Sequence, residues 1–326
     1  MGEKCLQMAM SSQSPQPLYV LRGLDSAVHS VKFLSSNLLV SGCQTGVVTT
    51  WNLKTLRKSA EEKTAHSKGI LGFEPVSTEE FWSHGRDGKV CLWRFGNGNL
   101  VCVRSLDLLT VGFCQCCSVA IDSKPFICGA WDGSGELAVL DVDDGALVAK
   151  FRPRQSTPTG MCMAVKDISD TEHTSRVLTA HEDGLVRTWD LRDTREPLSS
   201  LRTHSDPIFS CAFDGNQQRG VVAGAQSSLV SFSVDSSGQL STGKAAESPS
   251  SGVTNVDIRK DSKLMLCSLT DGRLMAYSWK SMKTLAVMSH HLQTVHTVSC
   301  APAGAEQHVF AAGGKDCTVS LWSLYK

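Results

Sequence analysis

The sequence predicts an all-β fold, in which seven four-stranded blades form one closed β-propeller. Three observations predict it. A polar turn followed by a short strand with an aromatic end recurs along the 326 residues. The second turn residues stand at positions 46, 88, 135, 184, 227, 272 and 317, so the copies are 42 to 49 residues apart. Apolar positions in these strands alternate with a period of two, which is typical of strands and not of helices.

Seven copies of the repeat follow one another along the chain, each with its last strand residue five positions after the second turn residue. Five copies show the pattern clearly: Thr45-Gly46 to Trp51, Asp87-Gly88 to Trp93, Asp183-Gly184 to Trp189, Asp271-Gly272 to Tyr277 and Asp316-Cys317 to Trp322. Two degenerate copies fit the same frame: Ser134-Gly135 to Leu140 and Gln226-Ser227 to Phe232. Gly and Asp at the turn and Val, Ile, Phe and Trp in the strands favour short hairpins.

An upstream strand precedes each turn, and a polar or His-bearing loop precedes that strand. The loop residue and the first apolar residue are four positions apart in four copies: Leu24 to Val28, His66 to Ile70, His204 to Ile208 and His291 to Val295. The pattern predicts strands over Val28–Phe33 and Leu38–Ser41 in repeat 1. It predicts strands over Ile208–Phe213 and Gly220–Gly224 in repeat 5.

The two ends of the chain predict how the ring closes. Repeat 7 stops directly after its Trp322 strand and lacks an outer strand, whereas Pro17–Arg22 has strand character and precedes repeat 1. We expect residues 17–22 to pair beside residues 318–323, because an open sheet edge invites aggregation. The predicted organisation is a flexible N-terminal tail over residues 1–16 and a single propeller over 17–326.

Charge and cysteine content narrow the function. Lys and Arg together number 32 and so do Asp and Glu, so the chain lacks the basic excess that binding nucleic acid or an anionic membrane requires. The 13 cysteines are odd in number and many lie in apolar runs, which favours free thiols in a reducing compartment. No signal peptide and no spanning segment of about 20 apolar residues is evident. We expect the cytoplasm, the nucleus or both.

These repeats resemble the WD-repeat family, and the resemblance covers residues 17–326, although only Trp189-Asp190 spells the family's dipeptide. Three segments are similar to one branch, the guanine nucleotide-binding protein β-subunit-like protein 1 family, the animal counterpart of the fungal ASTRA-associated propeller. They are Thr270–Met288, Val111–Cys114 and Gly314–Tyr325. The resemblance implies a role in the maturation and stability of phosphatidylinositol-3-kinase-related kinases, together with the Triple T co-chaperone.

A buried hydrogen-bonded chain of His, Ser or Thr, Asp and Trp is typical of WD blades. Repeat 2 has the one complete set: His66, Ser83, Asp87 and Trp93. Repeat 4 keeps Thr179, Asp183 and Trp189 without a clear loop histidine, and in repeat 7 Ala312 stands where the hydroxyl belongs. A His–Asp–Ser trio also suggests a hydrolase, but no Gly-x-Ser-x-Gly turn surrounds Ser83. We therefore interpret the set as structural and expect no catalytic residue.

Neither a metal site nor a cofactor site is predicted. The cluster Cys114-Gln115-Cys116-Cys117 lacks the distant second Cys pair that a zinc site requires. Gly96-Asn97-Gly98 is a hairpin turn by residue type and not a phosphate loop.

Candidate partner-binding residues come from the family resemblance, which places blade-to-blade loops and the turns before each third strand on one face. The turns contribute Gln44, Arg86, Trp131, Glu182 and Lys315, and the loops contribute Asp25, Lys68, Asp206 and Gln293. Trp131 is either a binding hot spot or a side chain that packs over the neighbouring blade. Two polar insertions, Lys166–Arg176 and Ser236–Gly252, are predicted to be solvated loops.

Four functions compete: a scaffold for other proteins, a signalling β-subunit, an enzyme and a reader of modified peptides. A non-catalytic scaffold for other proteins fits best, and a peptide- or signalling-complex-binding propeller unrelated to kinase maturation is the alternative. A γ-subunit partner is not expected, because the residues before the first strand contain Pro15 and Pro17 and no heptads. An enzyme lacks a channel cluster of acidic residues or metal ligands. A reader of modified peptides needs an aromatic cage, for which only Trp131 is available.

Overall fold

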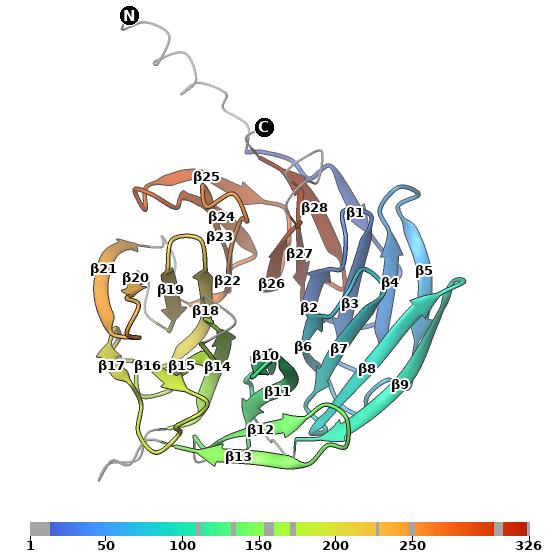
Figure 1. Ribbon diagram of the computed structural model, residues 1–326. Coiled ribbons are helices and arrows are strands. Elements are labelled where there is room, and N and C mark those ends of the chain that lie inside the picture. Colours follow the sequence, from blue (N-terminus) through green and yellow to red (C-terminus); the bar gives the residue numbers. More distant parts are fainter. Residues whose placement is uncertain are drawn as a thin grey trace, which may run out of the picture.

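Seven four-stranded antiparallel sheets are arranged around a common axis, as Figure 1 shows. The computed structural model describes residues 14–108, 112–131, 135–152, 160–169, 174–225, 228–247, 252–302 and 309–324. Every regular element in these ranges is a β-strand. The predicted all-β, seven-bladed propeller is confirmed.

The first three blades follow one another along the chain, and the first strand of each lies innermost (Figure 1). Blade 1 contains β2 (Val28–Phe33), β3 (Leu38–Cys43), β4 (Val48–Asn52) and β5 (Arg57–Glu62). Blade 2 contains β6 (Ile70–Pro75), β7 (Glu80–Gly85), β8 (Lys89–Gly96) and β9 (Asn99–Asp107). Blade 3 contains β10 (Cys117–Ile121), β11 (Lys124–Ala130), β12 (Leu137–Asp141) and β13 (Leu147–Phe151).

The remaining blades repeat this order. Blade 4 contains β14 (Cys162–Asp167), β15 (Arg176–His181), β16 (Leu185–Asp190) and β17 (Ser199–Arg202). Blade 5 contains β18 (Ile208–Asp214), β19 (Arg219–Gly224), β20 (Ser228–Val234) and β21 (Leu240–Glu247). Blade 6 contains β22 (Val253–Ile258), β23 (Leu264–Leu269), β24 (Arg273–Ser278) and β25 (Thr284–Ser289). Blade 7 contains β26 (Val295–Cys300), β27 (Val309–Gly314), β28 (Val319–Ser323) and β1 (Tyr19–Leu21).

Strand β1 closes the ring. It pairs antiparallel with β28, with Tyr19 opposite Leu321 and Leu21 opposite Val319. The buried Leu21 enters the core between blades 7 and 1. The predicted closure by an N-terminal strand is confirmed.

The core consists of seven clusters of buried side chains, one at each blade-to-blade interface of the described chain. The residue at the end of each third strand belongs to the cluster that faces the preceding blade. Trp322, for example, lies in the cluster between blades 6 and 7, and Leu140 lies in the one between blades 2 and 3. One large side chain at the end of a short strand therefore helps to fill each interface, and this side chain is aromatic in every blade except blade 3.

The turn glycines are required by the backbone. Gly46 and Gly184 have φ of 88° and 77°, and a Cβ on either would lie 2.1 Å from a carbonyl oxygen of the next blade's loop. In blade 7 this position is Cys317, which takes a φ of 60°. Only glycine adopts positive φ without steric cost, so the Cys317 turn is strained.

The prediction that Ser236–Gly252 is a solvated loop is wrong for about half of its residues. Residues 240–247 of the proposed Ser236–Gly252 loop form β21, which pairs with β20. The outer strand of a blade has one free edge and mostly exposed side chains, so it requires little apolar sequence. In the other insertion, Lys166 and Asp167 end β14 and Arg176 begins β15. Other predictions fall on residues outside the described ranges. These residues are Ser134, Gln226-Ser227, 1–13, 170–173 and 248–251.

Candidate protein-binding face

The turns before the third strands and the loops that lead into the blades lie side by side. The N–H of the residue just before the turn pair donates to a loop carbonyl in the same way in six blades. At the predicted positions these bonds are Gln44 to Ala27 at 2.8 Å, Arg86 to Gly69 at 2.8 Å, Glu182 to Met161 at 3.0 Å and Lys315 to Thr294 at 2.8 Å. We call the surface that these turns and loops form the top face. The structure thus brings the predicted turn positions and loops to one side of the ring.

The predicted residues differ in how far they reach the solvent. Seven of the nine are exposed: Gln44, Arg86, Lys315, Asp25, Lys68, Asp206 and Gln293. Glu182 is half-buried, and its Oε2 accepts a hydrogen bond from the N–H of Met161 at 3.1 Å. A side chain already engaged by its own loop has less freedom to bind a partner.

Trp131 departs from the other turn positions. Its N–H donates to the carbonyl of Glu136 instead of to an incoming loop. The indole is half-buried, packs against the cluster between blades 2 and 3, and carries the Lys150 ammonium 4.4 Å from its centroid. Of the two roles that the sequence left open, the geometry favours packing.

Three exposed apolar side chains on this side of the ring were not singled out from the sequence. Phe113 is 54% exposed, Phe209 is 41% exposed and Leu292 is 93% exposed. For one of them, the alternation of side chains between the two faces of a strand could have indicated the exposure. Phe209 stands between the buried Ile208 and Ser210 of an innermost strand, so its side chain points away from the blade core.

A cavity of about 460 Å³ lies on the propeller axis and is lined by residues of all seven blades. Six lining residues carry its chemistry: His29, Arg86, Phe113, Met163, Phe209 and His296. The described lining contains no Asp or Glu. Apolar walls with a few polar groups are typical of binding sites for small groups or peptide segments.

Arg86 and two histidines set the electrostatics of this cavity. The Arg86 guanidinium lies over the Phe113 ring, 4.6 Å from its centroid. The rings of His29 and His296 meet edge to face at 5.1 Å. Burial, then His296 and Arg86, lower the pKa of His29 to about 4, and burial followed by Lys315 lowers the pKa of His296. Both imidazoles are therefore neutral near pH 7, and Arg86 is the cation at their side.

Blade 2 contains the polar chain expected from the sequence. His66 Nδ1 lies 2.9 Å from Asp87 Oδ1, and His66 Nε2 lies 2.7 Å from Ser83 Oγ. The Trp93 indole N–H donates to the same hydroxyl at 2.8 Å. Burial alone raises the pKa of Asp87, but hydrogen bonds from His66 and the Ser67 N–H hold it below its ordinary value. The chain ties the top turn to the blade core.

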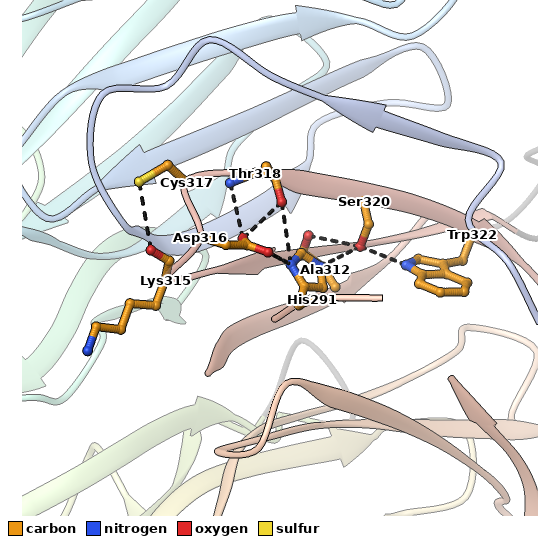
Figure 2. Close-up of polar contacts among 8 residues, drawn as sticks. All are labelled: His291, Ala312, Lys315, Asp316, Cys317, Thr318, Ser320 and Trp322. Atoms are coloured by element: carbon orange, nitrogen blue, oxygen red, sulfur yellow. Dashed lines mark hydrogen bonds and ion pairs between the residues drawn. The ribbon is translucent and has the colours of Figure 1, made fainter. Parts of the chain in front are cut away.

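Blade 7 has a second complete chain, so the prediction that repeat 2 holds the one complete set is wrong. His291 Nδ1 lies 2.9 Å from Asp316 Oδ2, and Ser320 Oγ lies 2.7 Å from His291 Nε2. The Trp322 indole N–H donates to the Ser320 hydroxyl at 2.7 Å, and Figure 2 draws this contact as a dashed line. Ser320 is the cross-strand partner of Ala312, so the missing hydroxyl comes from the residue directly opposite.

Blade 4 has a histidine on a strand in place of the loop histidine. His181, two residues after Thr179 on β15, places its Nε2 2.9 Å from the Thr179 hydroxyl. The Trp189 indole N–H donates to that hydroxyl at 3.0 Å. The sequence predicted a histidine only in the loop. His181 lies two residues after Thr179 on β15, so both side chains point to the same face of the strand.

These trios are poorly placed for nucleophilic catalysis. Ser83 and Ser320 are fully buried, and each hydroxyl is held between a histidine and an indole N–H. A serine nucleophile requires an exposed hydroxyl beside an oxyanion site. The arrangement instead satisfies buried polar groups.

The cysteines form no metal site among the described residues, where no group of three or more His, Cys, Asp or Glu side chains is placed to hold an ion. Twelve described cysteines are free thiols, and Cys114 Sγ lies 3.8 Å from Cys162 Sγ. The described part of the chain contains no helix with the length and apolar composition needed to cross a bilayer.

Comparison with known proteins relates the whole chain to one group of propellers. The WD domain, G-beta repeat family matches residues 282–323, which include most of blade 7. The chain is 30% identical to guanine nucleotide-binding protein subunit beta-like protein 1 of Mus musculus, over 97% of this chain and 98% of that one. It is 25% identical to ASTRA-associated protein 1 of Schizosaccharomyces pombe, over 95% and 99%. The protein of that name in Aspergillus flavus is also 25% identical, over 95% and 97%.

Proposed function

Because the chain belongs to the family of guanine nucleotide-binding protein subunit beta-like protein 1, a family of WD-repeat propellers, we propose that it is a non-catalytic scaffold for other proteins. Its finer role is to assist the maturation and stability of phosphatidylinositol-3-kinase-related kinases, together with the Triple T co-chaperone. The site of action is the cytoplasm, the nucleus or both.

The observation that carries the proposal is the top face. Exposed side chains of unlike chemistry gather there around an axial cavity, whereas the His–Asp–Ser trios are buried and hydrogen-bonded within the blades. A concave, mixed surface on a rigid ring suits protein partners. The family likeness supports the kinase role, and several fungal relatives carry the name ASTRA-associated protein 1.

Depletion of the protein from cells tests the kinase role. We expect the steady-state amounts of several phosphatidylinositol-3-kinase-related kinases to fall while their transcripts stay constant, because a maturation factor acts on the proteins. Re-expression of the wild-type chain should restore them. Normal kinase amounts after depletion would contradict this role and leave only the protein-binding scaffold.

The top face is tested in the same cells by re-expressing Arg86→Glu. We expect this variant to co-purify less of the co-chaperone, since an exposed cation at the cavity is replaced by an anion. Arg57→Glu is the matched control, because Arg57 is exposed on the outer strand β5 of blade 1. Equal co-purification by both variants would place the binding surface elsewhere.

A further inference from the structure

We propose that the top mouth of the axial cavity binds an extended peptide segment of a partner protein, in which an Asp or Glu stands close to a bulky apolar residue. The inference rests on the proposed scaffold function and specifies the chemistry of the partner. Three features of the cavity support it: an unpaired cation, an apolar wall and a lining without carboxylates.

Arg86 is the cation. It is exposed, lines the cavity and forms no ion pair with a carboxylate among the residues that the structure describes. Its guanidinium is held over Phe113, which fixes part of the side chain before a partner arrives. A preorganised guanidinium favours carboxylates because its planar fork donates two parallel hydrogen bonds.

The apolar wall of the cavity consists of Phe113 from blade 3, Met163 from blade 4 and Phe209 from blade 5. The two phenylalanines are each more than two-fifths exposed, although both lie on a concave surface. An apolar side chain of the partner can cover them and gain the free energy of removing their surface from water. Aromatic and Arg residues around one pocket are typical of binding hot spots.

The sign of the charge selects the partner. The chain as a whole carries as many acidic as basic residues, yet the described lining holds Arg86 and Lys166 and no Asp or Glu. The carboxylates predicted for the top face, Asp25, Glu182 and Asp206, are absent from the lining. A basic peptide would meet Arg86 with no compensating anion, whereas an acidic one is complementary.

The experiment uses a display library of random short peptides, selected against the full-length protein. We expect enriched peptides to carry Asp or Glu near Phe, Leu, Met or Trp. In fluorescence anisotropy, the best peptide should bind Arg86→Glu and Phe113→Ser at least about tenfold more weakly than the wild type, and Arg57→Glu equally well. Changing its acidic residue to Lys should abolish binding to the wild type and restore binding to Arg86→Glu.

Other outcomes overturn the proposal. These are a library that enriches no peptide, enriched peptides without acidic residues, and a best peptide that binds Arg86→Glu as well as it binds the wild type. A version with phosphoserine in place of the acidic residue separates the two sources of negative charge, and at least about tenfold tighter binding of that version would replace the carboxylate with a phosphate. Kinase amounts that fall on depletion while this test fails would leave the proposed function intact.

Discussion

The interface between blades 6 and 7 and the interface between blades 2 and 3 fill equivalent space by different means. At the first, Trp322 stacks on Phe310 with ring centroids 6.2 Å apart, and its indole N–H is held by Ser320. At the second, Leu140 stands at the tryptophan position, and Trp82 of β7 joins the same cluster. Trp131 packs against that cluster from the top.

The difference teaches what the ring requires. Each interface needs enough buried volume, and the source can be the end of the third strand or a neighbouring strand. The polar chain is a separate device, because it links the top turn to the core only where a tryptophan N–H and a histidine are both present. The described residues of blade 3 form no such chain, yet this blade still has four paired strands.

The largest expected effect comes from breaking the substitute interface. Trp82 is 4% exposed, so Trp82→Ala should lower the free energy of unfolding by about 3–5 kcal/mol through lost burial and a cavity. Trp131→Ala should cost about 1–2 kcal/mol, since its indole is only half-buried. Urea denaturation followed by circular dichroism measures both. Equal costs, or a cost below about 1 kcal/mol for Trp82→Ala, would contradict the idea that Trp82 replaces the missing tryptophan.

Acid should weaken the same interface. His84 of blade 2 accepts the Cys116 N–H of blade 3 through Nδ1, and burial followed by the nearby His66 lowers its pKa to about 3. The unfolded chain takes up a proton below about pH 6.5 and the folded chain does not, so stability is complete above that pH and falls as the pH decreases toward 3. At about pH 5, we expect protonation linked to His84 alone to lower the free energy of unfolding by about 1–2 kcal/mol.

The control for this pH dependence is His84→Asn, whose side-chain oxygen can also accept the Cys116 N–H. Unfolding free energies measured near pH 7.5 and near pH 5 should differ less for this variant than for the wild type. Some dependence should remain, because burial and then Arg187 also lower the pKa of His181 to about 3. An unchanged difference between the two pH values would show that His84 is protonated in the folded protein.

Another effect, smaller than that of Trp82→Ala, tests the polar chain of blade 7. Ser320→Ala leaves the Trp322 N–H and His291 Nε2 unpaired in the core, at a cost of about 1–3 kcal/mol. Adding Ala312→Ser places a hydroxyl at the position that Ser83 holds in blade 2, ten residues before the tryptophan, and should recover most of the loss. The Ala312→Ser single variant is the control. Failure of the double variant to recover stability would mean that only Ser320 can reach both partners.

The sequence predicted the ring because turn, strand and aromatic recur in a fixed frame, and each copy is a local signal. The sequence did not show where a side chain from another position takes the place of a missing group of the repeat. The Ser320 hydroxyl, the His181 imidazole and the Trp82 indole each replace a missing group from another position of the same blade or from its neighbour. The family resemblance placed the turns and loops of the candidate face on one side of the ring. Phe113 and Phe209 were missed, because exposure on a concave surface depends on how all seven blades meet.

The smallest expected effect separates the turn of blade 7 from that of blade 2. Gly88 takes a φ of 81°, whereas Cys317 holds the equivalent position with a φ of 60°. Cys317→Gly removes the steric cost of a Cβ in the left-handed region but makes the unfolded chain more flexible, so we expect a net gain of only about 0.5–1 kcal/mol. Cys317→Ala is the control, because it removes the thiol that lies 3.7 Å from the Lys315 carbonyl and keeps the Cβ. If the alanine variant is stabilised as much as the glycine variant, then the thiol and not the backbone strain distinguishes the two turns. If neither is stabilised, the Asp316 hydrogen bonds to the Thr318 N–H and hydroxyl already hold this turn as firmly as a glycine would.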